Sequence, residues 1–163
     1  MPQTKLLVEV QDKVMTLTLN RPEKLNAIDN ELADGLLSAL TLAASDGAVH
    51  AVLVLGNGRA FCAGRDVSAP ATEQDLVLVQ AVSRAMVMLD KPVVFGVHGW
   101  TVGAGFEWML NADVAIAGAD CRFKLPEASL GVFVTGGMTA TLPACAGLAR
   151  AKAMVLLGEE FNA

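Results

Sequence analysis

The chain has 163 residues, of which 53% are hydrophobic, and its mean hydropathy is +0.48, which is enough apolar material for the core of one domain. Twelve basic residues against 17 acidic ones leave a net charge of −5, which argues against a broad nucleic-acid-binding surface. The three cysteines include no CxxC pair, and only two histidines accompany them, so neither a disulfide framework nor a metal site is expected.

The first third of the chain predicts a hairpin, a helix and a buried strand. Residues 6–10 and 14–20 alternate apolar and β-branched side chains on either side of a short turn. Residues 30–45 carry apolar side chains at helical spacing, and Asp29 is placed to cap them. The sequence "VHAVLVL", residues 49–55, is typical of a buried strand.

The middle of the chain repeats a strand, a loop and a helix. A helix is predicted over residues 72–90 and a strand over 93–97, and "TVGAGFEWMLNAD", residues 101–113, reads as a turn into a helix. Strands are predicted at residues 114–118 and, more briefly, at 121–123. This alternation favours an α/β fold with mostly parallel strands and active residues in the loops at their carboxyl ends.

The loop "GNGRAFCAGRD", residues 56–66, allows three interpretations. A phosphate-binding loop fails, because Arg65 follows Gly64 where that motif needs lysine, and no dinucleotide motif is completed. A reactive thiol at Cys62 would need a base, but the candidate His98 follows an apolar strand, so we expect both to be scaffold residues. The third interpretation is a loop that presents backbone N–H groups to a developing negative charge.

A second loop of the same kind supports the third interpretation. Small residues at 103–105 precede a predicted helix, whose first N–H groups have no helical partner. Two such loops would form an oxyanion hole reinforced by the helix dipole. Glu107 and Glu127 accompany them and are candidates for moving protons or orienting a water, although either glutamate could equally serve the start of a helix.

Five motifs, taken in order and spacing, resemble the crotonase (enoyl-CoA hydratase/isomerase) superfamily. They are "LNRPEKLNAID", "GRAFCAGRD", "VHGWTVGAGFEWMLNADVAIAG", "FKLPEASLG" and "LLGEEF". The resemblance implies a ClpP/crotonase-like spiral of repeated ββα units that binds an acyl-CoA thioester and stabilises its enolate. It implies no metal and no separate cofactor, because coenzyme A is part of the substrate.

The resemblance also assigns roles at the centre of the site. The backbone N–H groups of Arg65 and Ala104 would hold the thioester oxygen, although the family usually has glycine where Ala104 stands. Glu107 would place a water and Glu127 would exchange the proton at C2, which is syn hydration of a trans-2-enoyl-CoA to a 3-hydroxyacyl-CoA. Many isomerase members keep only the second glutamate, so the presence of both favours a hydratase.

Residues that would bind the substrate follow from the same motifs. The CoA-binding surface would be formed by Lys24, Leu25, Ala27, Ala63, Asp66 and Val67, with Gly103 beside the thioester and Trp100 and Pro126 bordering the acyl channel. Lys24 and Arg59 are candidates for the CoA phosphates. The stretch "SLGVFVTGG", residues 129–137, lacks the proline and one residue of the family's usual sequence, so the acyl preference stays open.

The length of the chain departs from the family. Family members continue into helices that cap the acyl pocket and build a homotrimer or hexamer, so we interpret residues 1–163 as one crotonase-like core domain without its C-terminal helical trimerisation region. The sequence shows no signal peptide and no run of 18 apolar residues, from which we expect a cytoplasmic protein without a membrane partner. Two alternatives to a hydratase remain: an isomerase or other enolate-forming member, and a non-catalytic fragment that binds acyl-CoA.

Overall fold

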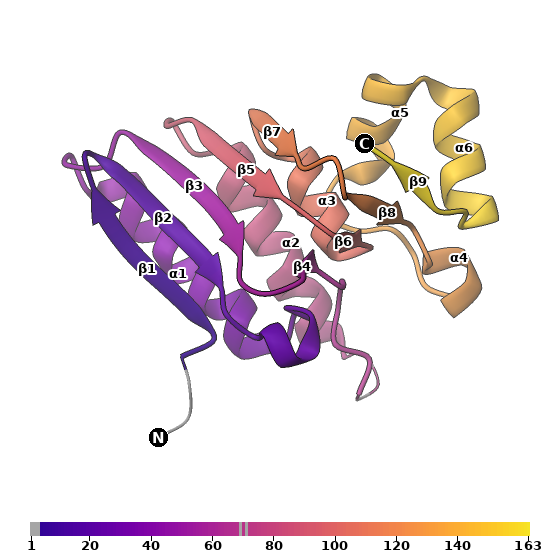
Figure 1. The fold of residues 1–163 in the computed structure, drawn as a ribbon, viewed down its shortest axis with the longest axis horizontal. Helices are drawn as coiled ribbons and strands as arrows, with labels where there is room; N and C mark the ends of the chain where they lie inside the picture. The colour runs from indigo at the N-terminus through magenta and orange to yellow at the C-terminus, as the bar shows by residue number, and fades with distance from the viewer. Residues whose placement is uncertain (1–3, 69, 71) are drawn as a thin grey trace.

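The strands form two sheets. The computed structural model describes residues 4–68, 70 and 72–163. A five-stranded sheet has the order β1-β2-β3-β5-β7, and a four-stranded sheet has the order β4-β6-β8-β9 (Figure 1). The first sheet consists of β1 (Leu6–Gln11), β2 (Val14–Leu19), β3 (Ala51–Gly56), β5 (Val93–Val97) and β7 (Val114–Ala117). The second consists of β4 (Ala60–Cys62), β6 (Trp100–Val102), β8 (Arg122–Lys124) and β9 (Phe161–Asn162).

The chain order repeats two strands and a helix. The helices are η1 (Pro22–Lys24), α1 (Asn30–Ser45), α2 (Glu73–Val87), α3 (Ala104–Leu110), α4 (Glu127–Leu130), α5 (Met138–Ala146) and α6 (Leu148–Leu157). The units are β1β2α1, β3β4α2, β5β6α3 and β7β8α4. Strands β2, β3, β5 and β7 run parallel to one another in the first sheet, and β1 pairs antiparallel with β2 at its edge. The expected spiral of ββα units with mostly parallel strands is therefore confirmed.

Local sequence signals explain where the first elements begin and end. The predicted hairpin forms with Leu6 opposite Leu19. The Oδ1 atom of Asp29 accepts a hydrogen bond of 2.9 Å from the N–H of Leu32, which caps α1 at its predicted first residue. Helix α2 begins with a capping box, in which Thr72 and the third helical residue Asp75 bond to each other's backbone N–H groups.

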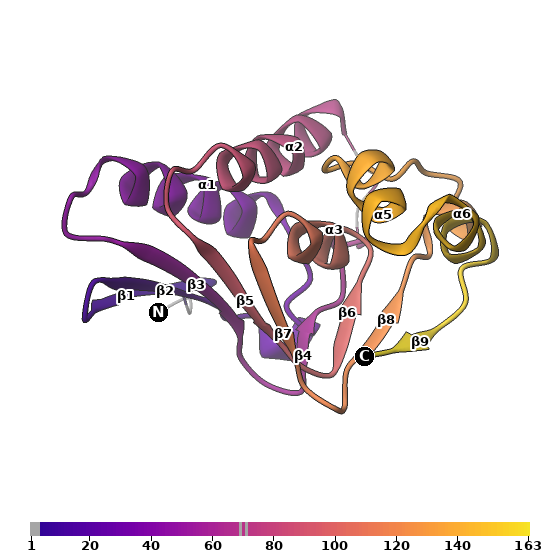
Figure 2. The same ribbon diagram turned by 90° about the horizontal axis from the view of Figure 1, so that it is seen from above.

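Helices α1, α2 and α3 cover one face of the first sheet (Figure 2). Strand β2 shows the resulting alternation, because Met15, Leu17 and Leu19 are buried while the residues between them are only half-buried. Each of these side chains contributes about 1.5–3 kcal/mol by leaving water. This packed layer holds the carboxyl ends of the parallel strands in place.

The short second sheet brings the candidate site together. Strand β4 lies inside the predicted loop 56–66, and β6 overlaps the start of the predicted turn at residues 101 and 102, so the sequence-based interpretation of these residues as irregular was wrong. Both strands have three residues, which is too short for apolar periodicity to show. Parallel pairing of β4 with β6 and of β6 with β8 brings the following loops to one edge, at residues 63–65, 103–105 and 125–127.

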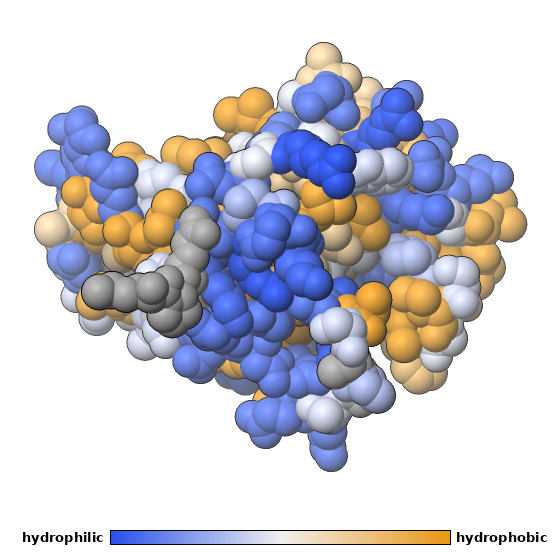
Figure 3. Space-filling view, turned by 60° about the horizontal axis from the view of Figure 1, so that its bottom comes forward, coloured by the Kyte–Doolittle hydropathy of each residue, from blue (hydrophilic) through white to orange (hydrophobic). Residues whose placement is uncertain are grey.

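Exposed apolar side chains occur in several parts of the molecule, among them β1, β7 and the segment around α4. Figure 3 shows a hydrophilic area in the middle of one face and hydrophobic residues toward its right, the side on which α4 lies in Figure 1. Exposed residues of α4 and the segment after it include Leu130, Val132 and Phe133, the last 91% exposed. Within the described ranges, no helix is both long and apolar enough to span a bilayer.

Candidate active site

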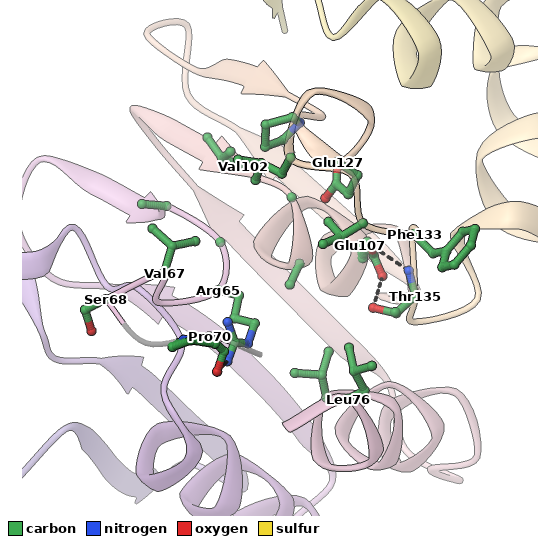
Figure 4. Close-up of a pocket in the computed structure, with 18 residues that line it drawn as sticks. Arg65, Val67, Ser68, Pro70, Leu76, Val102, Glu107, Glu127, Phe133 and Thr135 are labelled. Carbon is green, nitrogen blue, oxygen red and sulfur yellow. Dashed lines mark hydrogen bonds between the residues drawn. The ribbon is translucent and has the colours of Figure 1, made fainter. Parts of the chain in front are cut away.

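A cavity of about 620 Å³ lies where the three loops meet the start of α2. Figure 4 shows side chains from these separate segments around one space: Arg65, Val67, Ser68 and Pro70 after β4, Leu76 on α2, Glu107 on α3, Glu127 on α4, and Phe133 and Thr135 beyond it. The walls are largely apolar, with two carboxylates among them. This is the usual composition of a small-molecule site, in which a few polar groups fix the orientation of a ligand.

The loops after β4 and β6 approach each other closely at Gly64. Gly64 has φ +86°, and a Cβ at this position would lie 2.9 Å from the carbonyl oxygen of Val102 and 3.8 Å from the nitrogen of Ala104. Only glycine fits such a position without displacing the neighbouring backbone. The nitrogen of Ala104, the first residue of α3, therefore lies beside the segment that carries Arg65.

Hydrogen bonds to the segment after η1 set the direction of the Arg65 N–H group. The N–H of Ile28 donates to Gly64 O at 2.8 Å, and the N–H of Asp66 donates to Ile28 O at 2.8 Å. Successive peptide groups of an extended chain point to opposite sides, so the N–H of Arg65 points away from Ile28. In the described part of the chain, no acceptor bonds to the N–H of Arg65 or of Ala104.

The Arg65 side chain is held in an ion pair. Its Nη2 atom lies 2.5 Å from Asp75 Oδ2, and Asp75 also accepts a bond of 2.8 Å from the N–H of Thr72 and one of 2.6 Å from Asn30. The bond from Thr72, followed by those from Asn30 and Arg65, lowers the pKa of Asp75. The guanidinium charge is thus already matched, and the main-chain N–H is the group of Arg65 that is left for a ligand.

Asp66 lies in a second ion pair behind the same loop. Its Oδ2 atom is 3.0 Å from Arg21 Nη2, and its Oδ1 atom accepts a 3.0 Å bond from the N–H of Ser68. These bonds, that from Ser68 being the stronger influence, lower the pKa of Asp66 to about 2. Arg21 also donates to the carbonyl of Ala27, so both ion pairs fasten this loop to the protein.

Glu107 is buried in the first turn of α3 and is held from the far side of the cavity. Its carboxylate accepts a 2.9 Å bond from the N–H of Thr135 at Oε1 and a 3.1 Å bond from the hydroxyl of Thr135 at Oε2. The residue is only 2% exposed, and this burial raises its pKa, while the two bonds from Thr135 act in the opposite direction. Two oriented donors thus stabilise the ionised form of a buried carboxylate.

Glu127 is buried but much less supported. It is 7% exposed, and among the described residues its buried Oε2 atom has no hydrogen-bond partner. Its Oε1 atom lies against Gly103, where a Cβ would be only 2.8 Å away and φ is +49°. Burial, with a smaller contribution from the charge of Glu107, raises the pKa of Glu127 to about 7. An unpartnered oxygen in a cavity and a pKa near neutrality are typical of a group that exchanges protons.

This raised pKa predicts how stability depends on pH. The folded-state pKa of about 7 lies above the ordinary value of 4.5 for a glutamate, so the free energy of unfolding should fall as pH rises between these values. Glu127→Gln removes the charge, and we expect it to increase the free energy of unfolding by about 1–2 kcal/mol above neutral pH and by little in acid. Urea unfolding at several pH values measures this, with the exposed Glu9→Gln as control. A gain that is equal at every pH would contradict the burial argument.

The structure brings together most of the residues that the sequence singled out. The cavity is lined by Ala63, Arg65, Val67, Gly103, Ala104, Glu107, Pro126 and Glu127. Five others do not line it: Lys24, Leu25, Ala27, Asp66 and Trp100. Leu25 joins the site indirectly, because its carbonyl accepts a 2.9 Å bond from the N–H of Ala63. Lys24 and Arg59 are exposed, and the Trp100 ring lies 5.9 Å from the Arg122 guanidinium carbon.

Sequence reasoning missed one wall of the cavity and the support of Glu107. The unexpected lining residues include Leu76, Val79, Leu130, Val132, Phe133 and Thr135. Their apolar members resemble any core residue in sequence. Thr135 is a polar residue between valine and two glycines, a local signal that would have singled it out for inspection.

The alternative thiol chemistry finds no support. Cys62 is buried, its Sγ atom donates to the carbonyl of Asn26 at 3.3 Å, and burial raises its pKa to about 12. His98 shares a 2.9 Å hydrogen bond with the carbonyl of Gly58. Both are scaffold residues, as expected. Across residues 4–68, 70 and 72–163, no group of three or more His, Cys, Asp and Glu is arranged to hold a metal ion.

Comparison with known proteins agrees with this architecture. The family model described as enoyl-CoA hydratase/isomerase matches residues 9–163. The chain is 38% identical, over 98% of its length, to a 2,3-dehydroadipyl-CoA hydratase of Escherichia coli K12, and 35% identical, over 97%, to a 1,2-epoxyphenylacetyl-CoA isomerase of the same organism. The crystal structure of an enoyl-CoA hydratase from Mycobacterium avium subsp. paratuberculosis superimposes with a TM-score of 0.93 at 32% identity, over 99% of this chain and 64% of that one.

The matched relatives are longer than this chain. The alignments with both E. coli proteins cover 64% of the relative's length. The residues matched by the family model, 9–163, nevertheless span nearly all of both sheets, the two close loops and the positions of both buried glutamates. From its first strand to its last helix, the chain belongs to the enoyl-CoA hydratase/isomerase family.

Proposed function

We propose that this protein hydrates a trans-2-enoyl-CoA thioester to the 3-hydroxyacyl-CoA. The observation that carries the proposal is the meeting of two buried glutamates, Glu107 and Glu127, in one cavity beside the N–H groups of Arg65 and Ala104, which have no acceptor among the described residues. A pair of acid/base groups next to two backbone donors suits a reaction that passes through a thioester enolate. The hydratase names among its relatives agree with this choice.

In the proposed reaction the thioester oxygen accepts hydrogen bonds from the N–H groups of Arg65 and Ala104. Glu107 takes a proton from a water, whose oxygen forms the new bond to C3, and the electrons of the double bond move onto the thioester oxygen. The enolate then takes a proton at C2 from Glu127. One water is added in total, and proton exchange with solvent returns Glu107 to its ionised form and Glu127 to its acid form.

The contacts of the two carboxyl groups support this division of roles. Glu107 accepts two hydrogen bonds from Thr135, which favour an ionised base. Glu127 has an unpartnered oxygen and a pKa of about 7, which favour an acid that still carries its proton near neutrality. Carboxylic acids are tuned upward in this way in many enzymes that need a general acid.

The pKa of Glu127 gives the proposal a pH signature. An acid is protonated below its pKa, so we expect kcat/KM for hydration to decline as pH rises through about 7 and Glu127 loses its proton. In Glu127→Asp, whose shorter side chain reaches less far into the cavity, the midpoint of this decline should move. A pH profile that stays flat through neutrality would remove Glu127 from the role of acid.

The CoA portion, in this proposal, lies along the outer side of the loop after β4. The segments 24–28 and 63–67 are joined there by backbone hydrogen bonds, and their carbonyl and N–H groups form one continuous edge. Lys24 and Arg59 are exposed cations close to this edge in sequence and suit the CoA phosphates. The enoyl chain then extends past the two glutamates toward Leu76 and Phe133.

Isomerisation is the second candidate, because Glu127 alone has the features of a proton shuttle: a buried, unpartnered oxygen and a pKa near neutrality. An isomerase would move a proton between C2 and C4 without adding water. One relative carries an isomerase name, although its named substrate is an epoxide.

One experiment distinguishes these reactions. The protein is incubated with crotonyl-CoA and, in a parallel reaction, with a 3-enoyl-CoA, while the absorbance of the conjugated enoyl thioester is followed and the masses of the products are measured by mass spectrometry. Loss of absorbance with a mass gain of one water supports the hydratase. Conversion of a 3-enoyl-CoA into its conjugated isomer without a change of mass supports the isomerase, and binding without either reaction supports the non-catalytic alternative.

A further inference from the structure

The segment between α4 and α5 passes directly over Glu107. It is fastened to α3 at two neighbouring points: Thr135 bonds to the Glu107 carboxylate, and the amide of Asn111 donates to the carbonyl of Gly136 at 2.8 Å. The approach is close, since a Cβ at Gly136 would lie 2.6 Å from Glu107 Oε2. The bond at Gly136 and the bonds of Thr135 together hold this segment against the Glu107 carboxylate.

Thr135 supplies two different donors to the two oxygens of Glu107. The N–H group, at 2.9 Å from Oε1, would be present with almost any residue at this position. The hydroxyl, at 3.1 Å from Oε2, depends on the side chain alone. Threonine is also branched at Cβ, which restricts χ1 and limits how far the hydroxyl can turn away. A carboxylate bound at both oxygens cannot rotate freely about its last torsion.

Few other groups act on this carboxylate. Within the described chain, Glu107 forms no ion pair, and its hydrogen bonds come from Thr135 alone. Two other charged residues line the cavity: Arg65, whose guanidinium is paired with Asp75, and Glu127 of α4, whose like charge opposes ionisation of both carboxyl groups. Removing the hydroxyl would thus leave the Glu107 carboxylate with one of its two hydrogen bonds. Because the carboxylate is buried, water would replace the lost bond poorly.

We propose that Thr135 is a positioning residue for catalysis: its hydroxyl fixes the Glu107 carboxylate in the orientation that receives the proton of the attacking water. This rests on the proposed hydration. It adds a requirement on the side chain at position 135, in a stretch where the chain departs from its family's usual sequence. The expected consequence is an effect on turnover more than on substrate binding.

The test compares three side chains at one position. Thr135→Val keeps the shape and the N–H bond but removes the hydroxyl, and we expect kcat for crotonyl-CoA to fall by about tenfold with KM nearly unchanged. The acid limb of the kcat/KM profile should also move to higher pH, because Glu107 loses a donor that favours its ionised form. Thr135→Ser restores the hydroxyl and should return kcat to within about twofold of the wild-type value.

A matched control separates positioning from loop structure. Asn111→Ala releases the same segment at Gly136 without touching Glu107. We expect it to change KM or thermal stability and to leave the acid limb in place. If Thr135→Val and Asn111→Ala give the same profile, Thr135 only holds the loop and the inference is overturned.

A readout without turnover keeps this inference distinct from the proposed function. The carboxyl carbons of glutamate are labelled with ¹³C, the Glu107 signal is assigned by its loss in Glu107→Gln, and the signal is titrated by NMR. A higher titration midpoint in Thr135→Val supports the inference that the hydroxyl stabilises the ionised Glu107 carboxylate, even if the protein hydrates no substrate. An unchanged midpoint refutes this inference. Wild-type protein without hydratase activity would refute the proposed function instead.

Discussion

Replacing Glu107 or Glu127 by glutamine is expected to slow hydration of a trans-2-enoyl-CoA by about 10²- to 10⁴-fold, which is the usual contribution of a general acid or base. Glutamine keeps the size of the side chain but neither takes nor gives the proton. Binding should change much less, because the thioester oxygen and the CoA portion contact other groups. The measurement is kcat and KM for crotonyl-CoA, together with the Kd of an unreactive saturated acyl-CoA.

The outcome also distinguishes the reactions that the cavity could support. Glu73→Gln is the control, since Glu73 lies in the first turn of α2, as Glu107 does in α3, but is exposed to solvent. If both cavity variants turn over near the wild-type rate, the hydratase assignment fails. Loss of activity on changing Glu127 alone points to an isomerase, in which one carboxyl group moves the proton.

Gly64→Ala is expected to reduce hydration by about 10²- to 10³-fold, the cost of losing one donor of an oxyanion hole. The new Cβ would lie 2.9 Å from the Val102 carbonyl oxygen, so the loops after β4 and β6 would have to separate. The N–H groups of Arg65 and Ala104 would then no longer converge on one oxygen. Kinetics with crotonyl-CoA and far-ultraviolet circular dichroism together test for lost activity in a folded protein.

A second glycine provides the control for backbone strain. Gly147 also has a positive φ, +78°, but a Cβ there would meet nothing within 4 Å. Gly147→Ala should therefore destabilise the protein by a similar strain, about 1–3 kcal/mol, without loss of turnover. Equal losses of activity in the two variants would show that strain, and not the approach of the loops, explains the effect at Gly64.

Local sequence patterns predicted the elements that are long or that have clear start and stop residues at their ends. Helix α1 begins and ends where apolar spacing and the Asp29 cap place it, and β5 covers its predicted residues 93–97. Of the second sheet, only β8 was predicted, as a short strand at residues 121–123, and the other strands were missed because they are too short for a pattern to repeat. Their existence depends on pairing between residues about 20 to 40 positions apart, such as Cys62 with Thr101, which no local window contains.

The sequence could predict the loops and glutamates at the centre of the candidate site, but not the apolar residues that line the rest of the cavity. Small residues before a helix and glutamates at its start have a local chemical meaning, so Ala104 and Glu107 could be identified. The environment of Glu127 could not, because its pKa depends on burial and on a carboxylate from another helix. The role of Thr135 could not be predicted for the same reason: its local sequence marks it only as a polar residue, and its hydrogen bonds to Glu107 span 28 positions.

The three-residue strands β4, β6 and β8 also bear on how the protein folds. Isolated strands of this length are not stable, so the edge that carries the loops at 63–65, 103–105 and 125–127 exists only after three successive ββα units have docked. Contacts of such long range form late and slowly. Catalytic competence should consequently appear in the last kinetic phase of refolding, after most helical structure has returned, and loss of one docked unit would leave a partly folded chain without any active site.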